Sequence, residues 1–129
     1  MYMVKIVEAS IEYWDFIRIM RTCKDNTNGF EQQVEISTEQ QIKYMQRNSK
    51  NYYVCIDGDT PVGFVGCIDG DIRVATHPEH KKKGYGKLMI NFIFEKFPES
   101  YAKVKIDNDA SLELFKSCGF EKKYIILKK

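Results

Sequence analysis

The sequence has little that would bind the chain to a membrane, a metal ion or a nucleic acid. Its 129 residues contain no apolar run that approaches the roughly 20 residues of a membrane-spanning helix. The first four residues have the pattern of a strand rather than of a signal peptide. Only two histidines are present, and the four cysteines are not paired at metal-ligand spacing, so we expect no metal site. A net charge of +2 is too small for bulk binding to nucleic acid.

The cysteines and the overall composition fit one soluble, cytoplasmic domain. Cys55 and Cys67 lie in apolar, strand-like runs and are expected to be reduced and buried. Cys118 precedes Gly119 at a predicted helix end, where a packing role suffices to explain it and is favoured over a role as the nucleophile of a two-step transfer. A hydrophobic content of 43% with 13% aromatics is typical of a globular protein, and residues 1–129 suffice for a single domain with a sizeable core.

Apolar periodicity predicts an α+β fold, with a mixed sheet of about six strands and helices on both faces. A capping-box pattern that begins at Ser37 predicts one helix start, and Gly119 predicts the end of another helix. Strands are expected at 2–7, 51–56, 62–68, 71–76, 101–106 and 120–127. Helices are expected at 11–21, after Ser37, at 83–97 and at 109–117, and a long polar loop at 22–35.

The most informative stretch runs from His80 to Lys87, reads HKKKGYGK and leads into an apolar series typical of a helix. The N–H groups and the positive dipole at a helix start attract anions, and glycines let the backbone approach them closely. Three lysines at the same place favour a phosphate-bearing cofactor over a solvated loop. A Walker loop is excluded because Leu88 stands where Ser or Thr is needed. A dinucleotide fingerprint is excluded because Met89 replaces its third glycine.

Residues 74–87, VATHPEHKKKGYGK, resemble the acetyl-CoA-binding signature of the Gcn5-related N-acetyltransferases, in which a strand leads to Pro-Glu and a glycine-spaced loop. Residues 108–120, NDASLELFKSCGF, are similar to the second signature of the same family. The two motifs occur in order and at a suitable distance. There are two departures: Lys81 stands in place of the usual Arg or Gln, and Phe115 stands where many members carry a tyrosine proposed as general acid.

The resemblance implies that acetyl-CoA binds in a cleft between two splayed parallel strands, 71–76 and 101–106. Strand amides would pair with the pantetheine arm and stabilise the oxyanion that forms on the thioester. The amides of 82–87 would hold the diphosphate, while Asn108 and Ser111 would bind the arm from the other wall. A helix N-cap explains Asn108 equally well. The cofactor-binding residues implied are Val74, Ala75, Thr76, Lys81, Lys82, Lys83, Gly84, Tyr85, Gly86, Lys87, Asn108, Ser111 and Phe115.

The expected reaction is direct attack of a neutral primary amine on the thioester, which needs a group that removes a proton from the amine. The candidate bases are Asp71, Glu35 and His77. Each residue also has a simpler explanation. Asp71 could be only a turn residue, Glu35 a solvated charge in a loop, and His77 a histidine that faces solvent. Because Phe115 replaces the tyrosine of the family, the resemblance implies no general acid at this position. The thiol of CoA titrates near ~8.5, as an ordinary thiol does, so the thiolate leaves tolerably without one.

The acceptor is expected to be a small-molecule amine. Residues 30–37, FEQQVEIS, with Glu39 and Tyr44, look like a group in the family that acetylates amino sugars on nucleotide carriers. Protein N-terminal amines and polyamines stay open, as does a catalytically weak or inactive module that only binds CoA. The family usually has one more C-terminal strand, so a homodimer that covers an exposed sheet edge is a further hypothesis.

Overall fold

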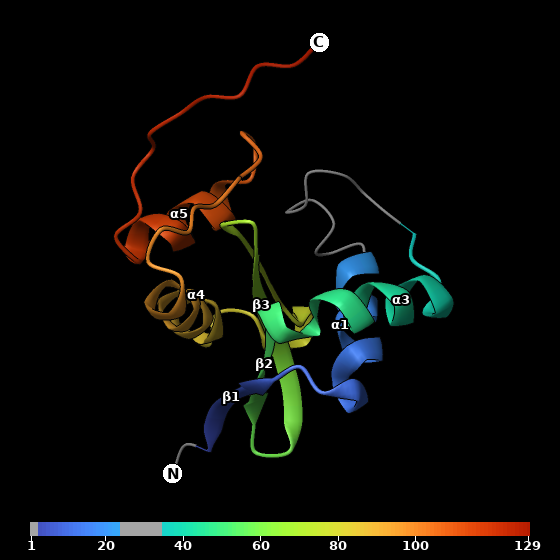
Figure 1. The fold of residues 1–129 in the computed structure, drawn as a ribbon. Coiled ribbons are helices and arrows are strands. Elements are labelled where there is room, and N and C mark those ends of the chain that lie inside the picture. The colour runs from blue at the N-terminus through green and yellow to red at the C-terminus, as the bar shows by residue number, and fades with distance from the viewer. Residues whose placement is uncertain (1–2, 24–34) are drawn as a thin grey trace.

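The computed structural model describes residues 3–23 and 35–129, and most of the predicted loop at 22–35 lies outside these ranges (Figure 1). The strands are β1 (Val4–Glu8), β2 (Tyr52–Asp57), β3 (Thr60–Ile68) and β4 (Asp71–Thr76). The helices are α1 (Trp14–Thr22), α3 (Thr38–Asn48), α4 (Tyr85–Lys96) and α5 (Asp109–Ser117). Three-residue 3-10 turns occupy Ile11–Tyr13, Ser49–Asn51 and Pro78–His80.

The four strands form one sheet in the order β1-β2-β3-β4, and every neighbouring pair is antiparallel. Tight turns join the last three strands. Gly58 lies in the first turn with φ 65°, and Asp69 and Gly70 lie in the second with φ 52° and 86°. Positive φ is the conformation that hairpin turns need and that glycine adopts without strain. An Asp-Gly pair lies in each of the two turns.

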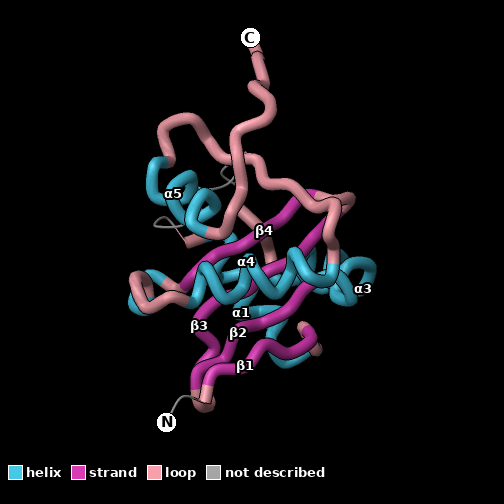
Figure 2. Tube along the Cα trace, turned by 90° about the vertical axis from the view of Figure 1, so that its left-hand side faces the viewer, coloured by secondary structure: helices cyan, strands magenta, loops and turns pink. Residues whose placement is uncertain are grey.

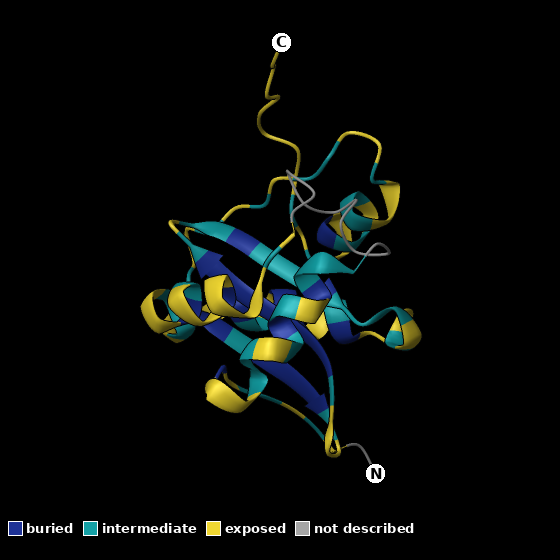
Figure 3. Ribbon diagram, turned by 90° about the vertical axis from the view of Figure 1, so that its right-hand side faces the viewer, coloured by how far each residue is buried: buried dark blue, intermediate teal, exposed yellow. Residues whose placement is uncertain are grey.

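Helices cover both faces of the sheet. α1 and α3 lie on one face, while α4 lies on the other with α5 beside it (Figures 1 and 2). Successive strand residues point to opposite faces, so each strand supplies two cores: Cys55 and Val65 enter the α4-side core, Val54 and Phe64 the α1/α3-side core. Figure 3 shows the buried strands between partly exposed helices. No helix in the described ranges combines the length and the apolar character needed to cross a membrane.

Two predicted strands are wrong, so the sheet of the described residues has four strands and not about six. At 101–106 the chain makes a single parallel bridge, between Tyr101 and Asp71, and then continues without a ladder. Ala102 and Val104 pack against the α4-side core instead. Residues 121–127 are exposed and form no strand (Figure 3). Residues that are common in strands favour an extended backbone. A strand also needs a neighbouring strand to hydrogen-bond with, and composition does not supply one.

The predicted helix signals are confirmed. The Ser37 hydroxyl oxygen accepts the N–H of Gln40 at 3.1 Å, and the Gln40 side-chain oxygen accepts the N–H of Ser37 at 2.9 Å. This is the capping box that the sequence indicated. Gly119, with φ 93°, follows the end of α5, and its N–H donates to the carbonyl of Lys116 at 3.0 Å.

Candidate active site

The glycine-spaced loop forms the start of α4, as the sequence predicted. Gly84 is the N-cap and has φ 87° and ψ 3°, a left-handed backbone that favours glycine. In the described chain no side chain caps this helix start, and its first turn has no acidic residue. A Cβ added to Gly84 would meet no described atom within 4 Å. No described atom fills the space beside Gly84, and the first N–H groups of a helix have no partner within it, so an anion could bind at this positive end of the helix dipole.

Lysines surround this helix start. Lys81, Lys82 and Lys83 precede it and are exposed, and Lys87 is exposed in the first turn. Lys82 adopts a positive φ of 65°, so the loop bends sharply before Gly84. Lysine binds phosphate as a point charge on a flexible stem, so several lysines adapt to a multiply charged anion without fixed geometry. The loop has the charge and the exposed amides that a diphosphate requires.

Gly86 serves a purpose that the sequence did not indicate. A Cβ at this position would lie 2.8 Å from Cδ2 of Leu114 on α5, closer than real contacts allow. Its missing side chain lets α4 pack against α5, rather than only letting a ligand approach the backbone. The contact holds α5, and therefore Asn108 at its start, next to the helix that follows the glycine-spaced loop.

Tyr85 anchors the start of α4 to the sheet. Its hydroxyl donates a hydrogen bond to Oδ2 of Asp57 at the end of β2. This bond, with burial as the second cause, raises the pKa of Tyr85 to about 12. Sequence reasoning missed this role of Asp57. No local pattern connects two positions 28 residues apart.

The outer edge of β4 is open beyond its first residues. The N–H of Ile72 donates to the carbonyl of Tyr101 at 2.8 Å, and the described chain adds no further ladder to this edge. Amides of alternate strand residues point to the same side. Val74 and Thr76 therefore present their N–H groups at the open edge, in the line that leads to α4. Ala75 turns its amide towards β3 by the same alternation, and its side chain is buried.

The second signature forms the start of α5. Oδ1 of Asn108 accepts the N–H of Ser111 at 3.1 Å, so the N-cap explanation of Asn108 is confirmed. The amide nitrogen of Asn108 takes no part in this bond. Phe115 is buried in the α4-side core, where its ring meets Phe120 edge to face at 5.3 Å. This position packs the helix and offers no acid.

A polar cluster lies at the α1/α3 face of the sheet. Nε of Arg73 lies 3.8 Å from Oδ2 of Asp71, and Arg73 also hydrogen-bonds the side chain of Tyr52. The hydroxyls of Tyr52 and Tyr44 are 2.7 Å apart, and the Arg21 guanidinium lies 4.9 Å from the centre of the Tyr44 ring. Burial, followed by the nearby Tyr44, raises the pKa of Tyr52 and keeps it neutral. Sequence reasoning missed this cluster, although a charged Arg73 inside an apolar strand was a usable signal.

The three candidate bases are not brought together. Asp71 and His77 stand at opposite ends of β4, six residues apart, a distance of about 20 Å along an extended strand. Nδ1 of His77 accepts the N–H of Glu79 at 3.1 Å and so caps a short turn. Glu35 is exposed just before α3. Asp71, with a side chain that is 18% exposed and paired with Arg73, is the candidate held most firmly.

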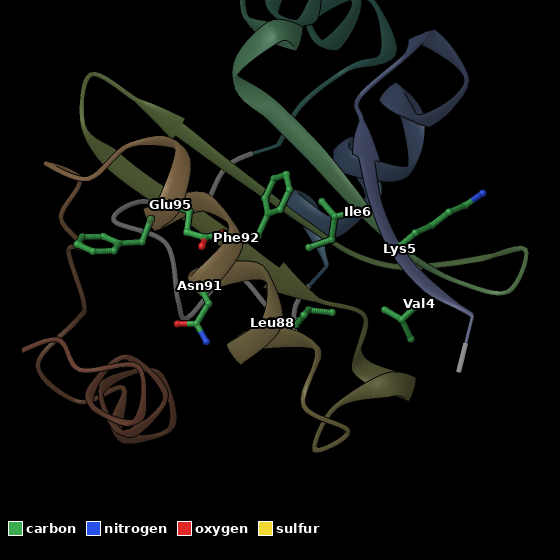
Figure 4. Close-up of a pocket in the computed structure, with 8 residues that line it drawn as sticks. Val4, Lys5, Ile6, Leu88, Asn91, Phe92 and Glu95 are labelled. Atoms are coloured by element: carbon green, nitrogen blue, oxygen red, sulfur yellow. The ribbon is translucent and has the colours of Figure 1, made fainter. Parts of the chain in front are cut away.

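A groove of about 570 Å³ lies between β1 and the outer face of α4 (Figure 4). Val4, Ile6, Leu88 and Phe92 give it an apolar floor. None of the residues implied for acetyl-CoA lines it, and it lies past the first N–H groups of α4. The groove is therefore separate from the glycine-spaced loop.

The model of the Acetyltransferase (GNAT) family matches residues 13–120. The match spans most of the chain and includes β4, α4, α5 and both sequence motifs. The chain belongs to this family.

Known proteins resemble this chain at low sequence identity, and the solved structures among them share its fold. An uncharacterised N-acetyltransferase of Methanocaldococcus jannaschii is 27% identical over 104 aligned positions, which cover 64% of this chain and 44% of that protein. The chain thus spans less than half the length of that relative. Spermidine N-acetyltransferase of Vibrio cholerae, solved with CoA and spermine, has a TM-score of 0.81 at 16% identity, covering 98% of this chain and 85% of its own. Ribosomal-protein-alanine N-acetyltransferase of Brucella melitensis has a TM-score of 0.79 at 17% identity, covering 91% and 84%.

Proposed function

We propose that this chain is an N-acetyltransferase that transfers an acetyl group from acetyl-CoA to a primary amine. The observation that carries the proposal is the start of α4, which is uncapped, open at Gly84 and surrounded by lysines. It follows the strand β4, whose outer edge is open, after a connection that contains the 3-10 turn Pro78–His80. A diphosphate with a long polar arm suits these two features in turn. Membership of the acetyltransferase family supports the assignment.

The direction of β4 gives the direction of the cofactor. The C-terminal end of β4 leads to α4, so a diphosphate at α4 puts the pantetheine arm beside Thr76 and then Val74. The reactive thioester then lies towards Asp71, away from His77. For this reason we assign the base to Asp71, and we assign His77 and Glu35 no proton transfer. Asn108 offers its amide nitrogen to the arm from α5.

The proposed chemistry is a direct transfer. The neutral amine nitrogen attacks the thioester carbon, the C–N bond forms, and the C–S bond breaks. The amine proton passes to Asp71, directly or through a water, and then to solvent. An amide of the open β4 edge stabilises the oxyanion as it develops. The thiolate leaves without a general acid, because Phe115 is buried in the core and offers no proton.

We propose an amino sugar on a nucleotide carrier as the acceptor. Two guanidinium groups, those of Arg73 and Arg21, lie with tyrosine hydroxyls at the face that adjoins Asp71. Guanidinium groups and hydroxyls bind phosphates and sugar hydroxyls. A polyamine would instead meet two like charges there. The motif at 30–37 supports the same acceptor, but residues 30–34 lie outside the described ranges.

The experiment is an acetyl-transfer assay with purified protein, acetyl-CoA and a matched set of amines. The set contains a nucleotide-linked amino sugar, the same sugar without the nucleotide, spermidine and a peptide with a free N-terminus. We expect the highest kcat/KM for the nucleotide-linked sugar, with the acetylated product identified by mass. Preferred transfer to another amine would support the proposed acetyl transfer and refute the proposed acceptor. Tight CoA binding without transfer to any amine would identify a module that only binds CoA.

We also propose a cytoplasmic homodimer. Four consecutive apolar side chains, Tyr124, Ile125, Ile126 and Leu127, are 93%, 85%, 61% and 88% exposed. Proteins normally cover such segments, and a second copy of the chain offers the same segment for pairing. Light scattering should give twice the mass of one chain. A monomer at high protein concentration would refute the dimer without affecting the assigned reaction.

A further inference from the structure

The chain's two histidines lie together with a carboxylate in the turn that joins β4 to α4. One nitrogen each of His77 and His80 and a carboxylate oxygen of Glu79 lie within 4.8 Å of one another. The two imidazole rings have centroids 5.3 Å apart and planes inclined by 57°. From this arrangement we propose that His77, Glu79 and His80 form a binding site for a divalent transition-metal ion such as Zn²⁺. The site goes beyond the proposed acetyl transfer, which needs no metal.

The local backbone brings these side chains together. Residues 78–80 form a 3-10 turn, in which positions three apart lie on the same side. His77 and His80 are three apart, and the N–H of His80 donates to the carbonyl of His77 at 2.8 Å, which closes the turn. Pro78 stiffens the turn because its ring limits φ. The two imidazoles are therefore held as neighbours by the backbone, before any ion binds.

The donor set selects the class of ion. Two imidazole nitrogens with one carboxylate oxygen suit Zn²⁺, Ni²⁺ or Cu²⁺, whereas Mg²⁺ and Ca²⁺ prefer oxygen ligands alone. Coordination bonds of about 2.0–2.2 Å require the three ligand atoms to move closer together. Glu79 is exposed and both histidines are partly exposed, so their side chains can rotate to close the site. Water would complete the coordination.

One existing bond limits the affinity. The N–H of Glu79 donates to Nδ1 of His77 at 3.1 Å, so Nδ1 is an acceptor and a proton of the ring belongs on Nε2. An ion at Nδ1 displaces this donor, and an ion at Nε2 requires the proton to move. Either route costs the hydrogen bond, so the binding is weaker than at a closed structural zinc site. A bound ion would also add positive charge beside the lysines that precede α4.

The experiment follows the imidazole resonances of the full chain by NMR while Zn²⁺ is added, with thiols reduced. Because the chain has only two histidines, both in the proposed site, every imidazole signal reports on it. We expect both rings to shift together and to saturate at one ion per chain. His80→Asn should weaken binding by at least about tenfold, as should Glu79→Gln. Glu121→Gln, a carboxylate change at an exposed position away from the turn, should have no effect.

Two controls make the outcome decisive. Thermal unfolding with a chelator should be the same for His80→Asn and the unaltered chain, which shows that the variant folds. A Cys23→Ser, Cys118→Ser double variant should bind Zn²⁺ as before, because these half-buried thiols are not ligands in the proposed site. Unchanged affinity in His80→Asn, or loss of binding in the cysteine variant, would overturn the proposal.

Discussion

The starts of α3 and α4 are built in opposite ways. At α3, Ser37 and Gln40 satisfy each other's amides through a capping box. At α4, Gly84 provides no side chain, and the described chain places no cap on the first amides. Glycine in place of a Ser, Thr, Asn or Asp cap costs only about a few tenths of a kcal/mol, so the open start of α4 gives up little stability relative to the capped start of α3. The comparison teaches that a capped helix start serves folding, while an open one is available to a ligand.

The start of α5 lies between these two cases. Asn108 caps the helix with its side-chain oxygen, as Ser37 does at α3. Unlike a serine hydroxyl, its amide group also carries a separate nitrogen donor. A single residue can thus stabilise the helix and bind a ligand with different atoms. Substitutions at the three helix starts should therefore have different effects on CoA binding and on the stability of the fold.

The largest effect is expected from Gly84→Asp. The new carboxylate would stand among the exposed amides and repel the diphosphate, and its Cβ would strain a positive φ. Affinity for CoA should fall by at least about 100-fold, measured by calorimetric titration. Gly58→Asp is the matched control, because Gly58 also has positive φ and open space around its Cα. It should cost similar stability and leave CoA affinity unchanged; equal loss in both variants would contradict the phosphate role of the α4 start.

The next effect concerns the two ends of β4. Asp71→Asn should lower kcat by about 10²–10⁴-fold, the usual contribution of a general base, and leave the Kd for CoA unchanged. His77→Asn, assayed with a chelator, should change kcat by less than about threefold, because this end of β4 lies near the phosphates rather than the thioester. The pH–rate profiles of both variants are the measurement. A larger loss in His77→Asn than in Asp71→Asn would reverse our assignment.

A smaller effect separates the two capped helices. Ser37→Ala and Asn108→Ala should each lower the free energy of unfolding by about 1 kcal/mol, because each removes an N-cap. Only Asn108→Ala should also raise the KM for acetyl-CoA, since Asn108 adjoins the proposed arm and Ser37 does not. Urea unfolding and steady-state kinetics give the two values. If Ser37→Ala raised this KM as much, the distinction between folding caps and ligand caps would fail.

The smallest effect concerns the anchor of α4. The Tyr85 pKa rises from 10.0 to about 12, so the folded state holds the phenol proton more tightly than the unfolded state. The stabilisation is therefore complete below pH 10 and is lost as the pH rises towards 12. The Tyr85→Phe variant should not lose this stabilisation as the pH rises from 10 to 12. The measurement is the difference between the free energies of unfolding of the two proteins as a function of pH. Parallel curves above pH 10 would show that the hydrogen bond to Asp57 does not stabilise the fold.

Features carried by a few neighbouring residues were predicted from the sequence. The capping box at Ser37, the glycine that follows α5 and the glycine-spaced start of α4 all depend on contacts within one helical turn. The predicted strands at 101–106 and 120–127 failed because a strand needs a partner edge, which composition does not provide. Cysteine spacing and histidine number gave the expectation of no metal site, which stays untested, and the proposed site at His77, Glu79 and His80 rests on the turn at Pro78, which places both imidazoles side by side.

The sequence by itself determined the capping box at the start of α3, the glycine that follows α5 and the place of the glycine-spaced loop before α4, because caps and glycines act on their own turn of chain. Only the tertiary structure decided that Leu114 closes over Gly86, that Asp57 receives Tyr85, and that Arg73 lies beside Asp71 and Tyr52. These contacts mostly join residues that are far apart in the sequence, and they form when packing of the sheet and helices outweighs the entropy lost in closing the chain.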